Sequence, residues 1–269
     1  MKLALHPGIR GPNLEMMADF CRYLRVEDLF YDLHCIESYQ DGGLANPSAL
    51  DQLQERFGSF GLRLSVLYDS LPDTVEALEK RREGLLGTLE LLARARVNTL
   101  VLFMLQEDSS ALMRPLEELY KAVVPRAEAL GIKIATHAHW CEGHIAYNRK
   151  TVQRIIEFAP QPSNGICLCT GCYFQAGDDV IAMIREMPDR IHCMHIRDTT
   201  LRGGCDFEEL AFGAGLAPIP GIMRALAEVG YDGIVIPEHM APIKDELYAE
   251  ASVAHAVGYL QGIMSAPGR

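Results

Sequence analysis

Short apolar runs alternate along the chain with longer segments whose apolar residues recur at helical spacing. This alternation constrains the fold more than any other feature, because strands that are separated by helices usually pair in parallel within one sheet. The apolar runs predict strands at Lys2–His6, Leu29–Ile36, Leu62–Tyr68, Thr99–Leu105, Ile132–His137, Gly165–Thr170, Ile191–Arg197 and Gly233–Glu238. The longer segments predict helices at Asn13–Leu24, Ser48–Phe57, Asp73–Arg94, Ser110–Leu130, Asn148–Phe158, Asp178–Met187, Ile219–Val229 and Asp245–Met264.

Eight strands, each followed by a helix, is the count of a closed (β/α)8 barrel, the TIM barrel of the α/β class. An open doubly wound sheet would show the same alternation, so the number of strands decides in favour of the barrel. No GxGxxG motif opens the first predicted helix, which disfavours a dinucleotide-binding sheet. The 269 residues match the roughly 250 that one such barrel needs, and no linker divides them. We therefore predict a single TIM-barrel domain over residues 1–269.

Composition narrows the classes of partner. Hydrophobic residues make up 49% of the chain, enough for a large core, and the net charge of −11 disfavours nucleic acid as a partner. No run approaches the roughly 20 apolar residues of a membrane span, and the apolar stretch at the N-terminus is too short for a signal peptide. We therefore expect a cytoplasmic protein with no membrane partner. Assembly into a homo-oligomer stays open.

Four residues that can bind metal stand at the C-terminal ends of four predicted strands: His137, Cys169, His195 and Glu238. In a barrel these ends meet at one face, which carries the catalytic residues. One histidine at a strand end is more often a hydrogen-bonded structural residue than a ligand. Imidazole, thiolate and carboxylate are all accepted metal donors, however, and here they fall on four successive strands. Their coincidence predicts a divalent-metal site.

Other polar side chains share this end of the predicted barrel. Because residues two apart on a strand face the same side, Arg197 should point inward with His195, and His139 with His137. His6 and Tyr68 end two further predicted strands. Arg197, His139 and His6 are therefore candidates for contacting a substrate beside the metal.

The eight cysteines do not suggest a disulfide framework, because most of them lie inside apolar strand-like runs. Cys167, Cys169 and Cys172 resemble half of a zinc or iron–sulfur motif, but the sequence lacks a second CxxC pair. Strand alternation places Cys167 beside Cys169, and Cys193 beside His195, on the inner face. We expect reduced thiols, most of them serving as small buried hydrophobes.

The segments NGICLCTGCY and DRIHCMHIRDTT, with a helix between them, resemble the mannonate dehydratases of the xylose-isomerase-like barrel superfamily. The segment IKIATH is similar to that family's strand ending in a ligand histidine. PEHM stands where the family has a Pro-Asp-His-Gly segment. The resemblance runs from about Gly131 to the C-terminus.

The resemblance implies a reaction and roles for single residues. The family removes water from a small-molecule sugar acid, D-mannonate, to give 2-keto-3-deoxygluconate. It implies that the four strand-end residues hold the metal, that His239 is an acid or base beside it, and that Arg197 faces the substrate carboxylate. It also implies Mn²⁺ or another octahedral ion. The thiolate and imidazole donors by themselves suggest Zn²⁺, and Fe²⁺ or Mg²⁺ are further candidates.

Two of the chain's departures from the family pattern concern residues of the site. Glu238 stands where the family has Asp, and the family's catalytic Tyr has no clear equivalent, which leaves Tyr248 as the nearest candidate. Three functions stay open: a metal-dependent sugar-acid dehydratase, a sugar isomerase or epimerase on the same barrel, and a non-catalytic sugar- or metal-binding descendant. An epimerase would want two opposed carboxylates, and only Glu238 is obvious, which favours the dehydratase.

Overall fold

The strands of the molecule close into a barrel in the order β1-β12-β9-β8-β7-β6-β5-β2, and every neighbouring pair is parallel. The computed structural model describes residues 1–10, 13–37, 39–40, 43–44, 46–103, 110–139, 142–200, 208–239 and 246–266. The barrel strands are β1 (Lys2–Leu5), β2 (Asp28–Asp32), β5 (Arg63–Ser70), β6 (Thr99–Phe103), β7 (Lys133–His137), β8 (Asn164–Cys169), β9 (Ile191–Ile196) and β12 (Ile234–Pro237).

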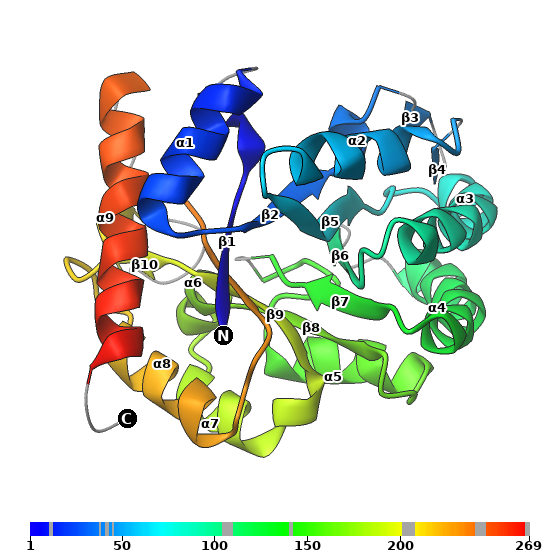
Figure 1. Cartoon of the computed structure of the whole chain (residues 1–269). Coiled ribbons are helices and arrows are strands. Elements are labelled where there is room, and N and C mark those ends of the chain that lie inside the picture. The colour runs from blue at the N-terminus through cyan, green and yellow to red at the C-terminus, as the bar shows by residue number, and fades with distance from the viewer. Residues whose placement is uncertain are drawn as a thin grey trace.

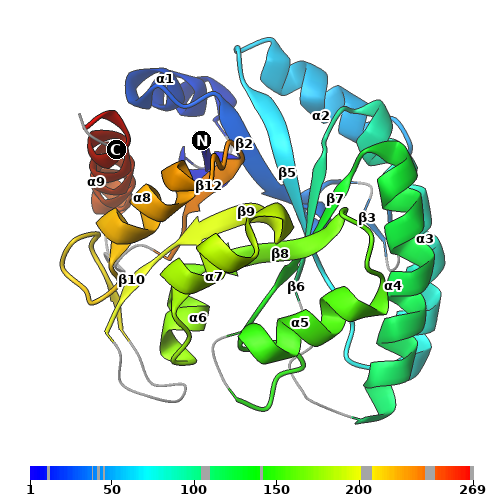
Figure 2. The same ribbon diagram turned by 90° about the horizontal axis from the view of Figure 1, so that it is seen from below.

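Helices surround the barrel, as Figures 1 and 2 show from two directions. They are α1 (Leu14–Leu24), α2 (Ala49–Gly58), α3 (Val75–Arg94), α4 (Ser110–Leu130), α5 (Arg149–Phe158), α6 (Thr170–Gln175), α7 (Val180–Glu186), α8 (Ile219–Glu228) and α9 (Glu246–Ser265). Short 3-10 helices lie at η1 (Pro7–Arg10), η2 (Leu33–Cys35) and η3 (Pro188–Arg190). The prediction of an α/β fold built as a TIM barrel is confirmed. Among the described residues, no helix has the length and apolar character needed to cross a membrane.

The element bounds differ from the predicted ones in a few places. The predicted strand Leu29–Ile36 ends at Asp32, because the apolar residues that follow it turn into η2. Helix α6 begins at Thr170, directly after β8, and the sequence does not predict it. Outside the barrel, β3 (Tyr39–Gln40) pairs with β4 (Gly43–Leu44), and β10 (Asp198–Thr199) pairs with β11 (Glu209–Leu210), both antiparallel. These pairs are too short to leave a pattern in the sequence.

Side-chain caps start several of the helices. Each of four N-cap side chains accepts a hydrogen bond from the backbone N–H three residues later, and these caps are Asn13, Thr74, Asn148 and Asp179. Asn148 and Thr151 bond reciprocally in a capping box at α5. A cap of this kind stabilises a helix by about 1 kcal/mol. The caps therefore fix the residue at which each of these helices begins, and with it the end of the loop that follows the preceding strand.

The apolar residues form two layers. The larger cluster lies between the barrel and the helices, and a smaller one takes alternate residues from the barrel strands. The smaller cluster fills the barrel interior with Ala4, Val66, Tyr68, Val101, Ala135, Cys167, Cys193, Ile234 and Ile236. Alternation along each strand therefore decides which side chains face the interior and, at the strand ends, which face the site.

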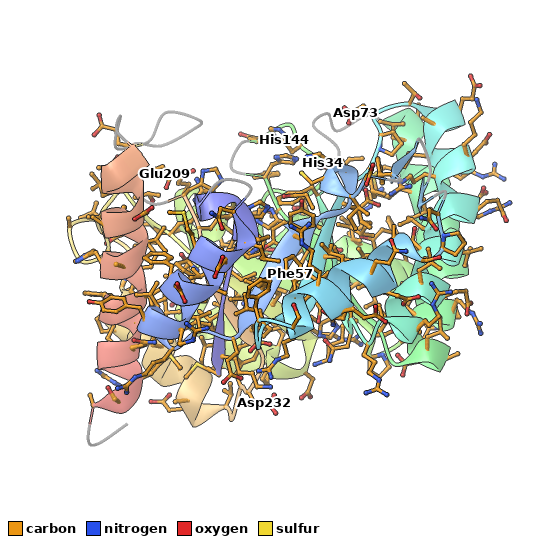
Figure 3. All side chains as sticks on the ribbon, turned by 45° about the horizontal axis from the view of Figure 1, so that its top comes forward. His34, Phe57, Asp73, His144, Glu209 and Asp232 are labelled. Carbon is orange, nitrogen blue, oxygen red and sulfur yellow. The ribbon has the colours of Figure 1, made fainter. Side chains whose placement is uncertain are left out.

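The two ends of the barrel differ in what they carry. Figure 3 shows His34, His144 and Glu209, which follow barrel strands in the chain, toward one end of the molecule. Asp232, which precedes β12, lies toward the opposite end. The first end is the one on which TIM barrels build their sites.

Candidate metal centre

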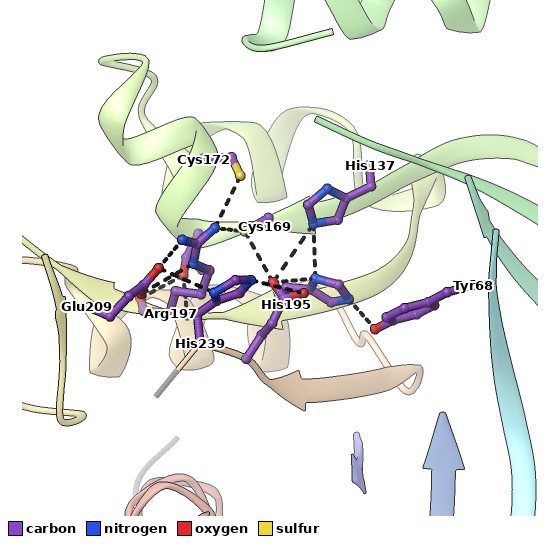
Figure 4. A network of polar contacts seen from close by, with 10 residues as sticks. Tyr68, His137, Cys169, Cys172, His195, Arg197, Glu209 and His239 are labelled. Carbon is purple, nitrogen blue, oxygen red and sulfur yellow. Dashed lines mark hydrogen bonds and ion pairs between the residues drawn. The ribbon is translucent and has the colours of Figure 1, made fainter. Parts of the chain in front are cut away.

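Four side chains converge at the C-terminal end of the barrel: His137, Cys169, His195 and Glu238. One possible ligand atom from each lies within 4.8 Å of the others. His137 and Cys169 are the last residues of β7 and β8, His195 is in β9, and Glu238 directly follows β12. Cys169 and His195 are direct partners in the strand register, which places their side chains at the same height (Figure 4). The structure thus brings together the four residues that the sequence selects.

The contacts within this group are close. The Nδ1 atom of His195 lies 2.8 Å from Oε2 of Glu238 and 3.0 Å from Nε2 of His137. The same Oε2 lies 3.9 Å from Nε2 of His137 and 3.9 Å from Sγ of Cys169. His137, Cys169 and His195 are buried, and Glu238 is nearly so. The group is therefore shielded from water except on the side of the carboxylate.

Burial and mutual charge have opposite effects on the pKa values of Cys169, His195 and Glu238. Burial by itself raises the pKa of the Cys169 thiol, but contacts with Cys172, Arg197, His137 and His195 hold that pKa well below its usual value. Burial lowers the pKa of His195, yet Glu238 and the neighbouring thiols raise it well above the usual value. Likewise, burial raises the pKa of Glu238, and His195 reverses the shift and lowers it. The cluster favours a thiolate and a carboxylate.

The donor set fits a divalent cation. Two imidazoles, a thiolate and a carboxylate present lone pairs toward one another at hydrogen-bond distance or just beyond it. Without a cation, only protons could relieve the repulsion between these lone pairs. Nitrogen and sulfur donors suit zinc and similar borderline ions, while the carboxylate also accepts harder ions such as manganese. His137, Cys169, His195 and Glu238 are thus the residues that could hold the metal.

Arg197 lies beside the cluster and has its own partner. Its guanidinium forms a buried ion pair with Glu209 of β11, and its Nη1 lies 3.7 Å from Sγ of Cys169 and 3.6 Å from Sγ of Cys172. Burial lowers the pKa of Arg197, but the thiols and Glu209 raise it by more than burial lowers it. The pKa is therefore above its usual value, and the group stays charged. The sequence selects Arg197 but not Glu209, because Glu209 reaches the site only through the pairing of β10 with β11.

His239 lies beside Glu209, as Figure 4 shows, and also approaches Glu238. Its Nδ1 lies 3.7 Å from Oε1 of Glu209, and its Nε2 lies 4.0 Å from Oε1 of Glu238. The side chain is 52% exposed, and partial burial together with Arg197 lowers its pKa despite the nearby Glu238. Tyr248 belongs to α9, but its side chain lies outside the described residues.

Tyr68 of β5 contacts the cluster from inside the barrel. Its hydroxyl group is hydrogen-bonded to Nε2 of His195 (Figure 4). Glu238 contacts the other ring nitrogen, Nδ1. Burial raises the pKa of Tyr68 well above its usual value, which keeps the phenol neutral. The signal in the sequence is its place at the end of the predicted strand Leu62–Tyr68, whereas β5 continues to Ser70, and that place alone assigns it no role. The hydrogen bond fixes the orientation of the His195 ring.

The other two candidates for substrate contact lie outside the four-residue group. His6 stacks on Tyr31 at 5.3 Å and has Nε2 3.4 Å from Oδ2 of Asp32. Ring contacts through Phe30 connect His6 to Tyr68, with centroid distances of 5.3 and 4.9 Å. His139 stacks on His144 at 4.4 Å in the loop after β7.

Comparison with known sequences identifies relatives over most of the chain. Residues 72–268 match the family model described as D-mannonate dehydratase (UxuA). The mannonate dehydratase of Enterococcus faecalis is 32% identical over 168 residues, which cover 58% of this chain and 47% of that protein. Mannonate dehydratase 1 of Halalkalibacterium halodurans is 34% identical over 154 residues, which cover 52% and 43%. The matched part therefore spans less than half the length of these curated relatives.

Solved structures resemble nearly the whole fold. A mannonate dehydratase from Streptococcus suis superposes with a TM-score of 0.79 at 17% identity, covering 98% of this chain and 93% of that one. The IolI protein with a bound zinc atom gives 0.79 at 17%, covering 98% of both chains. A xylose isomerase domain protein from Alicyclobacillus acidocaldarius gives 0.76 at 18%, again covering 98% of both. Identities this low establish the fold alone, a xylose-isomerase-like TIM barrel.

Proposed function

The chain belongs to the D-mannonate dehydratase (UxuA) family, and on this premise we propose that it is a metal-dependent sugar-acid dehydratase. Its proposed substrate is D-mannonate, which would give 2-keto-3-deoxygluconate, or a related aldonate. The observation that carries the proposal is the convergence of two imidazoles, a thiolate and a carboxylate at the C-terminal end of the barrel. Family membership bears out the resemblance of the CTG and HIRD segments.

His137, Cys169, His195 and Glu238 would hold one divalent ion. When bound, such an ion polarises the oxygens of the substrate and stabilises the negative charge that develops as a proton leaves the carbon beside the carboxylate. We propose Mn²⁺ as the working ion, with Zn²⁺, Fe²⁺ and Mg²⁺ as alternatives for the test. The thiolate of Cys169 gives Zn²⁺ the strongest claim among these alternatives.

His239 would move the protons of the reaction. Dehydration removes a proton from the carbon next to the carboxylate and expels the hydroxyl of the following carbon as water. The enol that forms then becomes the 2-keto acid. A base near neutrality suits the first step, and the lowered pKa of His239 keeps its ring neutral at pH 7, ready to accept a proton. Its exposure lets it exchange that proton with water.

Arg197 would bind the carboxylate of the sugar acid. A guanidinium pairs with a carboxylate in a planar, bidentate manner, and in the free chain Glu209 occupies this position. The substrate carboxylate would therefore take over part of the pairing with Arg197 from Glu209. His6 and His139 would contact the far hydroxyl groups of the substrate, and Tyr248 is the further catalytic candidate.

One observation favours a second candidate function, an epimerase. Glu209 adds a carboxylate beside Glu238, and burial raises the pKa of Glu209 against the effect of Arg197. Two carboxylates are what an epimerase needs to move a proton between the faces of a sugar. The ion pair with Arg197, however, engages Glu209, so the dehydratase remains the better-supported function.

The test is a panel of aldonic acids and ketose sugars incubated with the chain in the presence of each ion. We expect a 2-keto-3-deoxy acid from D-mannonate or a close relative, detected as loss of water by mass spectrometry. An isomerised sugar of unchanged mass would support the epimerase. If no product forms with any of the ions, the result would support a non-catalytic sugar- or metal-binding descendant.

A matched pair of variants ties the activity to the site. Glu238→Gln keeps the size of the side chain but removes its charge, so we expect loss of both bound ion and product. Glu228→Gln is the control, because Glu228 is paired with Arg185 on the outer surface. Equal activity of the two variants would refute the proposed site.

A further inference from the structure

Two thiols face each other inside the barrel, below the candidate metal centre. Cys167 of β8 and Cys193 of β9 are direct partners in the strand register, one inward position before the pair Cys169 and His195. Both thiols are fully buried, and both belong to the inner apolar cluster. The sulfur atoms of this pair and one ring nitrogen of His195 lie within 4.8 Å of one another. The proposed dehydratase reaction uses neither thiol.

The ring of His195 lies between the candidate metal centre and the two thiols below it. Its Nδ1 atom faces His137 and Glu238, and its Nε2 atom faces the hydroxyl of Tyr68, whose ring belongs to the inner cluster. One nitrogen is thus directed to the upper donors and the other to the barrel interior. A lower ion could reach Nε2 without touching the upper ligands.

We propose that Cys167, Cys193 and Nε2 of His195 form a second metal position that takes a thiophilic ion such as Zn²⁺ or Cd²⁺. Thiolate ligands select soft and borderline ions over Mn²⁺ or Mg²⁺. Two sulfurs and one imidazole make three of the four donors that zinc takes in a tetrahedral site, and the hydroxyl of Tyr68 is in reach of the fourth position. Ala4 and Ala135 fill the same cluster with no polar atom, so packing does not require thiols here.

Sharing His195 sets the order of binding. A neutral imidazole has one lone pair, so both nitrogens can bind ions at once only after the ring loses its remaining proton. The first equivalent of a thiophilic ion is therefore expected to bind more tightly than the second. The harder ions are expected to stop at one equivalent, because the lower position offers them no carboxylate.

The experiment is a titration of the chelator-stripped chain with Cd²⁺, followed by the ultraviolet absorbance of the cadmium–thiolate bond and by metal content. We expect two equivalents in the natural chain. In the double variant Cys167→Ala/Cys193→Ala only Cys169 remains as a thiolate ligand, so we expect one equivalent and about one third of the absorbance. Alanine suits these positions because alanines already pack in the same layer.

Two further variants complete the design. Cys21→Ala removes another buried free thiol, which lies on the buried face of α1 outside the proposed position, and should keep both equivalents. Cys169→Ala weakens the upper position and should keep the absorbance of the lower pair. Should the double variant fail to fold, the single variants Cys167→Ala and Cys193→Ala serve the same comparison.

Binding of one equivalent by the natural chain, or a second equivalent that survives loss of both thiols, would overturn the proposal. The readout is bound metal and not turnover, so the result stands apart from the proposed dehydratase activity.

Discussion

Glu238 and His239 are neighbours in the chain, yet one side chain is directed into the metal cluster and the other is half exposed. The backbone at His239 has a φ of 45°, in the left-handed region that residues with a Cβ rarely adopt. Such a conformation costs about 1 kcal/mol or more and persists where the surroundings impose it. Here it turns the imidazole away from the ligand side of Glu238 and toward Glu209.

This geometry separates holding the ion from moving a proton. We expect His239→Asn to keep the bound ion while turnover falls by about 10²- to 10⁴-fold, the usual contribution of a positioned acid or base. Asparagine tolerates the left-handed backbone, so the loop should keep its shape. Metal content and turnover are measured on the same preparation. Loss of both together would show that His239 only positions Glu238, and Tyr248 would become the better catalytic candidate.

His192 carries a pH dependence of stability at the opposite end of β9. Its ring is buried, and burial together with Lys133 lowers its pKa from 6.5 to about 4. Between these values the unfolded chain binds a proton that the folded chain does not, so stability falls as the pH drops from about 6.5 to about 4. The loss amounts to about 3 kcal/mol at most.

His192→Gln removes this titration. We expect the free energy of unfolding of the variant to fall less steeply than that of the natural chain over the same pH range, as measured by urea denaturation. Parallel pH profiles would contradict the assignment. Above pH 7 the two profiles should run parallel, because neither the folded nor the unfolded chain then carries a charge at this position.

At the scale of elements, the site depends on how closely β8 and β9 approach. Gly165 is the second residue of β8, and a Cβ at this position would lie 2.3 Å from the carbonyl oxygen of Arg190 and 2.5 Å from Nε2 of His192. The absence of a side chain thus lets β8 lie against the start of β9. Further along the same pair of strands the register shifts between Ile166 and Cys167, and Cys169 then lies opposite His195.

Gly165→Ala is therefore expected to destabilise the fold by about 1–3 kcal/mol, the usual effect of overpacking. The matched control is Gly87→Ala inside α3, where a Cβ meets open space. That change should stabilise the chain by up to about 1 kcal/mol, because alanine favours the helix. Thermal unfolding of both variants gives the comparison. A Gly165→Ala variant as stable as the natural chain would show that β8 can shift freely.

The sequence predicts most of the strands and helices because hydrophobic periodicity encodes them. Each barrel strand is a run that buries alternate residues inward, and the last inward residue of such a run becomes a site residue. The periodicity does not encode α6, which has only six residues, or the pairing of β10 with β11. Glu209 reaches Arg197 through that pairing, so its place in the site follows from long-range contacts that no local pattern shows.

At the scale of the whole molecule, the four candidate ligands come from consecutive members of the closed sheet. The order β12-β9-β8-β7 places Glu238, His195, Cys169 and His137 side by side around the barrel. Strand β12 also pairs with β1, the first strand of the chain, so the sheet that carries the ligands has no open edge. An ion held by all four would join the last strand to three earlier ones, and the unfolded chain could not offer this arrangement.

Stability should therefore depend on the ion. An ion that binds only the folded chain stabilises it by about 2.7 kcal/mol at one hundred times its dissociation constant. For a chain of this size that corresponds to a rise of roughly 5–10 °C in the melting temperature. We expect chelator to lower the melting temperature, and Mn²⁺ or Zn²⁺ to restore it in the natural chain and in Glu228→Gln. Glu238→Gln should respond much less, because loss of the carboxylate removes the bond from the ion to β12. An equal response in Glu238→Gln would mean that the stabilising ion binds elsewhere, since a site lacking its only carboxylate ligand could not hold the ion as tightly.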